Sequence, residues 1–240
     1  KGAGVYDFFL PLLAGGQANN NQLPFVDLRI FDRTGSSFEG NVHLGYRQVN
    51  LKEKKLYGIY TSFDRRKTDK GNYFNQVMLG GEYWQDKWFI GGNIYKPIGR
   101  TKRYLGESRI DSRVDNRIGK GIIVTNTNKY YEHSQAGIDA ELGHAFTDNL
   151  TGYAGGYYFT ADDTPTVLGP KLRFTYDYLP TGKNKKVLKI FDGLSFETGI
   201  QHDKPRGTSG YIGIKLKVGL SPHETANVSG FERHMIELVR

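Results

Sequence analysis

Residues 75–97 read NQVMLGGEYWQDKWFIGGNIYKP, and both halves of this stretch alternate between apolar and polar positions. In the first half Leu79 falls on one face and Glu82 on the other. In the second half Ile94 falls on one face and Asn93 on the other. A period of two residues indicates a β-strand, and the three polar residues QDK between the halves leave room only for a tight turn. The stretch therefore predicts an antiparallel hairpin with one apolar face and one polar face.

The same alternation recurs along most of the chain. Together with the two arms of the first hairpin, nine further segments make eleven predicted strands. These segments are residues 5–13, 24–32, 40–49, 56–64, 136–146, 150–160, 167–178, 194–202 and 211–220. Repeated strands of about ten residues separated by turns are typical of an all-β sandwich or barrel.

The composition agrees with a chain of many strands and turns. Among 240 residues there are 31 Gly and 16 Tyr, but only two Met and eight Pro, and there is no Cys. No run of about 18 apolar residues is present, so the sequence predicts no transmembrane helix. The net charge of +8 raises nucleic acid or anionic lipid as a partner. Because the Lys and Arg residues are scattered and form no basic helix, nucleic acid is not expected to be a partner.

Two architectures use strands with one apolar face. A soluble sandwich or lipocalin-like barrel points the apolar face inward, whereas an outer-membrane barrel points it at lipid and keeps polar residues in its lumen. Charges of both signs on nearly every polar face, and aromatic residues near the ends of the apolar stripes, favour the membrane. The interpretation is a transmembrane antiparallel up-and-down β-barrel.

The polar faces of this barrel supply the candidate pore-lining residues. Their opposite charges can pair with one another across a wet lumen, or hold a peptide threaded through it. The predicted set is Asp27, Arg29, His43, Arg47, Asp64, Glu82, Asn93, Asp139, Glu141, Lys171, Arg173, Glu197, Lys215 and Lys217.

Connection lengths predict the topology. Very short connections at 85–87 and 147–149 are typical of periplasmic turns, and the longer ones at 65–73, 98–134 and 203–210 of extracellular loops. Single-chain bacterial barrels have an even number of strands, so we expect twelve, with the first lying before Lys1 or reduced to a stub at its start. Within 98–134, RIDSRV and GIIVTNT predict a small extra hairpin. The segment 181–192 is long for a periplasmic turn and is interpreted as holding a helical turn.

The strand pattern ends at Leu220, which divides the chain into a barrel at 1–220 and a tail at 221–240. Ser229 and Glu232 have the spacing of a helix capping box. In such a helix Phe231, Met235 and Leu238 would share one face. An unstructured terminus is the alternative that the residues leave open.

Five stretches together resemble the translocator barrel of inverse autotransporters, the intimin/invasin family of adhesins. They are FFLPLL (8–13), NVHLGYRQV (41–49), LYGIYTSFDRR (56–66), QVMLGGEYWQDKWFIGGNIYKPIG (76–99) and GFERHMIELVR (230–240). The resemblance implies a twelve-stranded barrel in the bacterial outer membrane with a periplasmic N-terminus. It implies that the tail re-enters the pore and carries an adhesive passenger to the surface. The residues of this pore linker would be Ser229, Phe231, Glu232, Arg233, Met235 and Leu238.

The resemblance also implies partners. They are outer-membrane lipid and lipopolysaccharide, the barrel-assembly machinery and periplasmic chaperones, the chain's own passenger, and a host receptor reached through that passenger. No cofactor is implied, and we expect the chain to be the anchor and secretion pore alone.

Two other functions remain open. A diffusion porin would need an empty lumen and a periplasmic tail. An outer-membrane hydrolase would need a site, and His202 with Asp203 could activate water. The pair Asp162 and Asp163 is too small a set of oxygens for calcium. Because no nucleophile-elbow or zinc motif occurs, we expect a solvated polar loop, no metal and no enzyme.

Overall fold

The computed structural model describes residues 3–12, 22–33, 37–115, 121–178 and 191–218. Within these residues the secondary structure consists only of strands and their connections. No helix among them is long and apolar enough to cross a membrane. The predicted helical turn at 181–192 and the predicted tail helix fall wholly or largely outside the described residues, although β12 already begins at Phe191.

Eleven strands form one large sheet. In the order of their pairing they are β1 (Ala3–Pro11), β2 (Gln22–Arg33), β3 (Ser37–Asn50), β4 (Lys55–Lys67), β5 (Tyr73–Gln85), β6 (Trp88–Ile98), β9 (Ala136–Ala145), β10 (Leu150–Thr160), β11 (Val167–Tyr178), β12 (Phe191–Asp203) and β13 (Gly207–Val218). Every neighbouring pair is antiparallel. The prediction of an all-β antiparallel fold is confirmed, and each of the eleven predicted strands corresponds to one strand of this sheet.

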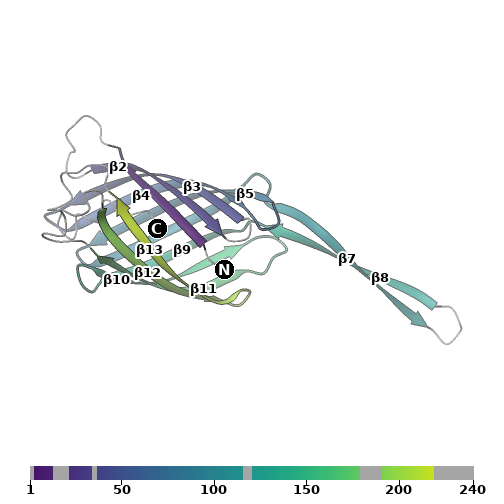
Figure 1. Ribbon diagram of the computed structural model, residues 1–240. Coiled ribbons are helices and arrows are strands. Elements are labelled where there is room, and N and C mark those ends of the chain that lie inside the picture. The colour runs from purple at the N-terminus through teal and green to yellow at the C-terminus, as the bar shows by residue number, and fades with distance from the viewer. Residues whose placement is uncertain (1–2, 13–21, 34–36, 116–120, 179–190, 219–240) are drawn as a thin grey trace.

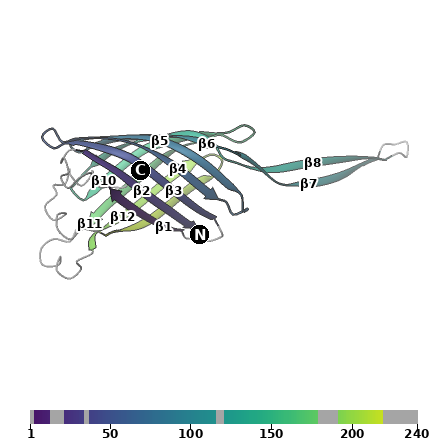
Figure 2. The same ribbon diagram turned by 90° about the horizontal axis from the view of Figure 1, so that it is seen from above.

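The sheet curls, so that its first and last strands both lie at the front of Figure 1, and the strands are strongly tilted in both views (Figures 1 and 2). No pairing joins β1 to β13 among the residues that the structure describes. Since eleven antiparallel strands alternate in direction, β1 and β13 run the same way. No twelfth strand occurs in the described part of the sheet.

The opening hairpin of the sequence is β5 and β6, paired up to Gln85 and Trp88. Its loop is therefore two residues long, shorter than the three predicted, and Asp86 adopts a positive φ of 51°. Asp is one of the few residues that tolerate this left-handed conformation, because its short side chain can bond locally.

A second sheet is the hairpin of β7 (Lys102–Asp115) and β8 (Gly121–His133), which projects far beyond the end of the curled sheet (Figures 1 and 2). It occupies the place predicted for a small hairpin but has strands of 14 and 13 residues. The register of β7 and β8 shifts between Tyr104 and Gly106, so that one extra residue sits in β7 as a β-bulge.

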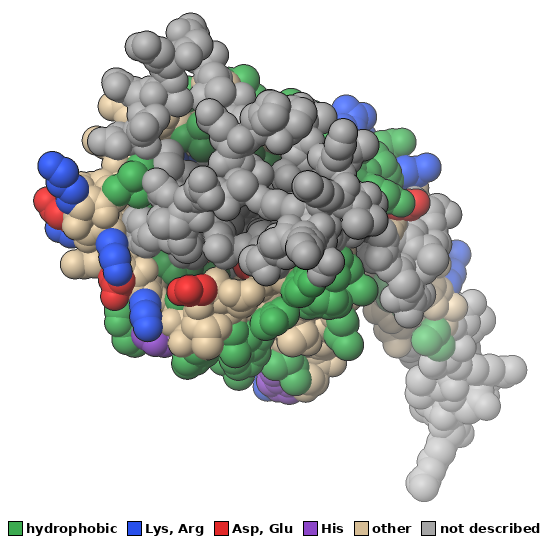
Figure 3. All heavy atoms as spheres, turned by 60° about the vertical axis from the view of Figure 1, so that its left-hand side comes forward, with side chains coloured by type: hydrophobic (Ala, Val, Ile, Leu, Met, Phe, Trp, Pro, Cys, Tyr) green, Lys and Arg blue, Asp and Glu red, His purple; other side chains and the backbone are tan. Residues whose placement is uncertain are grey.

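The two faces of the large sheet have opposite chemistry. Large apolar side chains on the convex face are exposed over most of its strands, among them Tyr6, Leu44, Ile59, Leu79, Ile94, Ile138, Leu172, Ile200 and Ile212. In Figure 3 hydrophobic side chains spread over the visible outer wall. A soluble barrel would bury these residues and expose the polar ones, so the structure favours a lipid-covered wall over the lipocalin-like alternative.

The lipid-facing direction can be tested with spin labels, because the chain has no native Cys. A nitroxide on Leu79→Cys in lipid vesicles is expected to collide more with oxygen, which partitions into lipid, than with a water-soluble nickel chelate. The same label on Asp86→Cys in the β5–β6 turn should show the reverse preference. Greater nickel accessibility at position 79 would contradict a lipid-facing wall.

Candidate functional site on the concave face

The concave face collects most of the polar residues singled out from the sequence. Asp27, His43, Arg47, Asp64, Glu82, Asn93 and Arg173 are buried there, and Arg29, Asp139, Glu141, Lys171 and Glu197 are half-buried. Lys215 and Lys217 lie in β13, but their side chains are outside the described part of the structure. The alternation along each strand explains this gathering, because every second residue points to the same face.

Arg47 of β3 and Glu82 of β5 form a buried ion pair across the intervening strand β4. The residue of β4 that pairs in register with both is Gly58. A Cβ atom added at Gly58 would come within 2.6 Å of the Glu82 Cγ atom. The absence of a side chain at Gly58 is therefore what lets the guanidinium and the carboxylate meet over β4. The Arg47 guanidinium also lies 4.9 Å from the centre of the Phe25 ring.

Tyr60 of β4 and Asn93 of β6 also meet across a glycine of the strand between them. The Tyr60 hydroxyl donates to Asn93 Oδ1 at 2.9 Å, crossing β5 at Gly80, which pairs in register with both. Asn93 Nδ2 then donates to the Asp139 carboxylate at 3.3 Å. The Tyr95 hydroxyl reaches the same carboxylate at 2.6 Å. Polar groups of β4, β6 and β9 thus form one connected chain of hydrogen bonds.

Charged residues of β9, β11 and β12 continue this network. Lys171 Nζ lies 2.9 Å from Asp139 Oδ1 and 3.2 Å from Glu141 Oε1. Arg173 Nη2 lies 2.6 Å from Glu141 Oε2, and Arg173 Nη1 lies 3.7 Å from Glu197 Oε2. Gly155 of β10 stands in register between Glu141 and Lys171. Two cations are therefore shared among three carboxylates, and each charge has a partner where water is largely excluded.

A third group of charges lies on β1, β2 and β3. Arg29 Nε donates to Asp7 Oδ1 at 2.6 Å, and Arg29 Nη2 lies 3.9 Å from Asp27 Oδ2. His43 Nδ1 lies 3.3 Å from the Asp27 carbonyl oxygen. Asp7 was not among the predicted pore-lining residues. Its place between the apolar Tyr6 and Phe8 was a sufficient signal, because it marks the polar face of β1.

Apolar residues also lie on the concave face, which the sequence interpretation missed. Five of them form a buried cluster beside the short turns at 51–54 and 86–87, namely Val49, Leu56, Trp84, Phe89 and Tyr153. Phe25, Tyr60 and Met78 form a second cluster, with Phe9 and Tyr95 packed against it. The two-residue strand period could have predicted these interior residues, since Trp84 and Met78 fall on the same face as Glu82. The interior therefore alternates between apolar packing and paired charge.

The residues considered for hydrolysis are not brought together. Asp203, at the end of β12 next to its turn, accepts hydrogen bonds from the Tyr157 hydroxyl and Arg206 Nε, both at 2.8 Å. The bonds from Arg206 lower the pKa of the Asp203 carboxyl to about 2. His202 is exposed and contacts Thr208 Oγ1 at 2.8 Å. Neighbouring strand residues point to opposite faces, so His202 and Asp203 form no dyad.

The other acidic candidates, Asp162 and Asp163, lie on the surface. Asp163 forms an exposed ion pair with Lys102 at 3.1 Å, and Asp162 is exposed beside it. Within the described residues, no group of three or more His, Asp or Glu side chains could hold a metal ion.

Comparison with known proteins gives one family and one fold. The family model described as "Inverse autotransporter, beta-domain" matches residues 6–143, which is more than half of the chain. A solved structure described as "Unveiling the Mechanism Behind the in-meso Crystallization of Membrane Proteins" superposes with a TM-score of 0.59 and 14% identity, over 90% of this chain and 77% of that one. At that identity the likeness shows the fold alone. No match was found among curated protein sequences.

The buried ion pair gives a stability prediction. Arg47→Ala should destabilise the folded protein by about 3–5 kcal/mol, because it leaves the buried Glu82 carboxylate unpaired. The double variant Arg47→Met with Glu82→Leu should recover most of this loss. The exposed pair of Lys54 and Asp86, 3.1 Å apart, is a matched control whose removal should cost less than about 1 kcal/mol. Urea unfolding in lipid vesicles, followed by tryptophan fluorescence, measures all three, and equal losses for the two pairs would contradict the interpretation.

The glycines give a second prediction. Gly58→Ala should destabilise by about 1–3 kcal/mol, because the new methyl group displaces Glu82 from Arg47. Gly81→Ala in the adjacent strand is the control, since its Cβ would meet nothing nearer than the Gly58 carbonyl oxygen at 3.7 Å. That control should be neutral or slightly stabilising in the same unfolding assay. A loss at Gly81 as large as at Gly58 would show that strand conformation, rather than space over β4, sets the requirement.

Proposed function

Because the chain belongs to the inverse autotransporter β-domain family of the bacterial outer membrane, we propose that it anchors a C-terminal adhesive passenger and exports it to the cell surface. The observation that carries this proposal is the reversed polarity of the sheet. Its convex face is apolar and exposed, and its concave face holds buried ion pairs. Such a wall is stable only with lipid outside and polar contents inside.

The direction of the edge strands supports a closed barrel of twelve strands. β1 and β13 run the same way, so they cannot pair antiparallel with each other. One strand of opposite direction between them would close an all-antiparallel barrel and remove both open edges. Open sheet edges are not tolerated in lipid, because their backbone N–H and C=O groups would have no partners. We assign the missing place to the predicted twelfth strand. A stub at the start of the chain cannot fill it, because Ala3 and Gly4 already belong to β1.

Three short turns and the projecting hairpin support one orientation in the membrane. Short turns at 51–54, 86–87 and 146–149 lie at one end, and the long β7–β8 hairpin projects from the other (Figure 1). Outer-membrane barrels keep short turns in the periplasm. We therefore propose that the hairpin lies outside the cell. β1 begins at the same end as the hairpin, so the proposed periplasmic N-terminus requires a strand that precedes β1.

The tail at 221–240, which the structure does not describe, is proposed to pass through the pore. A threaded segment needs partners for its backbone groups, and the concave face offers both cations and carboxylates. The pore linker would use Ser229, Phe231, Glu232, Arg233, Met235 and Leu238. The apolar cluster near the short turns would then meet the apolar side chains of this linker as it enters.

The proposed partners follow from this role. The outer wall would contact lipid and lipopolysaccharide. The barrel-assembly machinery and periplasmic chaperones would insert the barrel, and a host receptor would be bound by the passenger. The barrel itself would carry out no chemical reaction and need no cofactor.

An epitope tag directly after Arg240 tests the path of the tail. On intact cells the tag is expected to bind antibody and to be removed by external protease. Tags in the 161–166 connection and in the 86–87 turn serve as controls for the outside and the inside of the outer membrane. A terminal tag that becomes accessible only when the outer membrane is broken would leave the tail in the periplasm, and a porin would replace the proposed function.

A further inference from the structure

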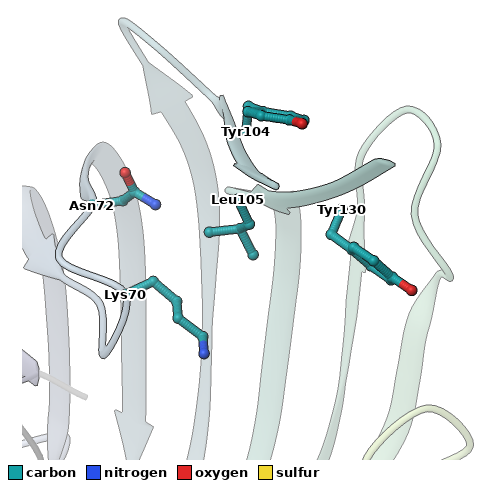
Figure 4. Close-up of a pocket in the computed structure, with 5 residues that line it drawn as sticks. All are labelled: Lys70, Asn72, Tyr104, Leu105 and Tyr130. Carbon is teal, nitrogen blue, oxygen red and sulfur yellow. The ribbon is translucent and has the colours of Figure 1, made fainter. Parts of the chain in front are cut away.

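A cavity of about 480 Å³ lies where the projecting hairpin leaves the sheet. Lys70 and Asn72 of the β4–β5 connection line one side, and Tyr104, Leu105 and Tyr130 of the hairpin line the other. Figure 4 shows Leu105 between Asn72 and Tyr130, with Lys70 lower down on the side of Asn72 and Tyr104 above. The cavity is therefore bounded by two separate segments of the chain.

The β-bulge of β7 builds the hairpin side of this cavity. Tyr104 and Leu105 together oppose the single residue Tyr131, and Gly106, with a positive φ of 140°, then pairs with Tyr130. In a regular strand Tyr104 and Leu105 would point to opposite faces. The extra residue re-aims the side chains, as bulges next to binding sites commonly do, and brings both to the cavity.

The other side of the cavity is held in place by Glu132. Its carboxylate accepts hydrogen bonds from Thr68 Oγ1 at 3.0 Å and from Asn72 Nδ2 at 2.7 Å. These bonds fix the β4–β5 connection against β8, so the distance across the cavity is set before any ligand arrives. A preformed cavity loses less entropy on binding than one that must assemble.

The two segments that bound the cavity are rich in cations. Residues 65–73 and 100–107 contain seven Lys and Arg but only two Asp and Glu, which are Asp69 and Glu107. Glu132 is engaged as described above, and Asp163 pairs with Lys102. Lys70 forms no ion pair with any residue that the structure describes. Its ammonium group is therefore available for an anion brought by a ligand.

We propose that this cavity binds an anionic saccharide, a sugar ring that carries a phosphate or carboxylate group. The exposed rings of Tyr104 and Tyr130 and the side chain of Leu105 offer flat and apolar surfaces to the C–H face of the ring. Lys70 would pair with the anionic group, and the phenol hydroxyls would bond the sugar hydroxyls. The source is either the phosphorylated sugars of lipopolysaccharide in the same membrane or a glycan outside the cell. Only the first rests on the proposed outer-membrane location.

The test uses the full chain in lipid nanodiscs and three soluble probes: glucose 6-phosphate, glucose and inorganic phosphate. Saturation-transfer NMR and titration calorimetry should show glucose 6-phosphate binding at least tenfold more tightly than either of the others. Lys70→Gln should lower that affinity about tenfold and leave glucose unaffected. Tyr130→Ala should weaken the binding of both glucose 6-phosphate and glucose. Tyr130→Phe should restore the binding that depends on contact with the sugar ring.

Lys87→Gln and Tyr158→Ala, which lie away from the cavity, are matched controls and should bind as the parent does. Heat-modifiable migration on gels shows whether each variant is folded. No binding of glucose 6-phosphate, equal binding of inorganic phosphate, or unchanged binding in both cavity variants would overturn the proposal. Lipopolysaccharide placed in the same nanodisc distinguishes the sources. If it displaces glucose 6-phosphate the ligand is the membrane's own sugar, and if it does not, the ligand comes from outside.

Discussion

The exposed apolar wall requires every charged side chain of the strands to find its partner on the opposite face of the sheet. Lipid offers no hydrogen bonds, so a charged side chain on the convex face would have no partner, whereas one on the concave face can pair with its neighbours. The structure meets this requirement by pairing across, rather than only between, adjacent strands. Arg47 reaches Glu82 over Gly58, and Tyr60 reaches Asn93 over Gly80. Small residues in the strand between are thus as necessary to the network as the charged residues themselves.

This arrangement gives the glycine content of the chain a specific meaning. In a soluble sheet a glycine within a strand mainly weakens it. Here it opens space on the concave face, as Gly45 does beneath the Phe25 ring. The interior is consequently a packed mixture of rings and ion pairs.

Much of this could be predicted from the sequence, because a period of two residues fixes both the strands and their faces. The position of Glu82 opposite Leu79 already assigns one to the interior and the other to lipid. The apolar clusters could have been read from the same period, but a polar lumen was assumed, and Trp84 was not assigned to the interior. The length of the β7–β8 hairpin and its bulge could not be foreseen, because Gly106 and the turn residues carry no apolar alternation. The pairing of Lys171 with two carboxylates depends on register between strands, which local patterns do not specify.

The β7–β8 hairpin also bears on the order in which the sheet assembles. β6 and β9 are neighbours, yet residues 99–135, 37 in all, separate them. Closing a flexible loop of that length is costlier than closing one of about five residues by roughly 1.5–2 kcal/mol. Because Lys102 pairs with His133 at its root, a hairpin that has already formed delivers the two flanking segments side by side. Hairpin formation takes microseconds and needs only local contacts, so this projection would turn the most distant pairing of adjacent strands in the sheet into a nearly local one.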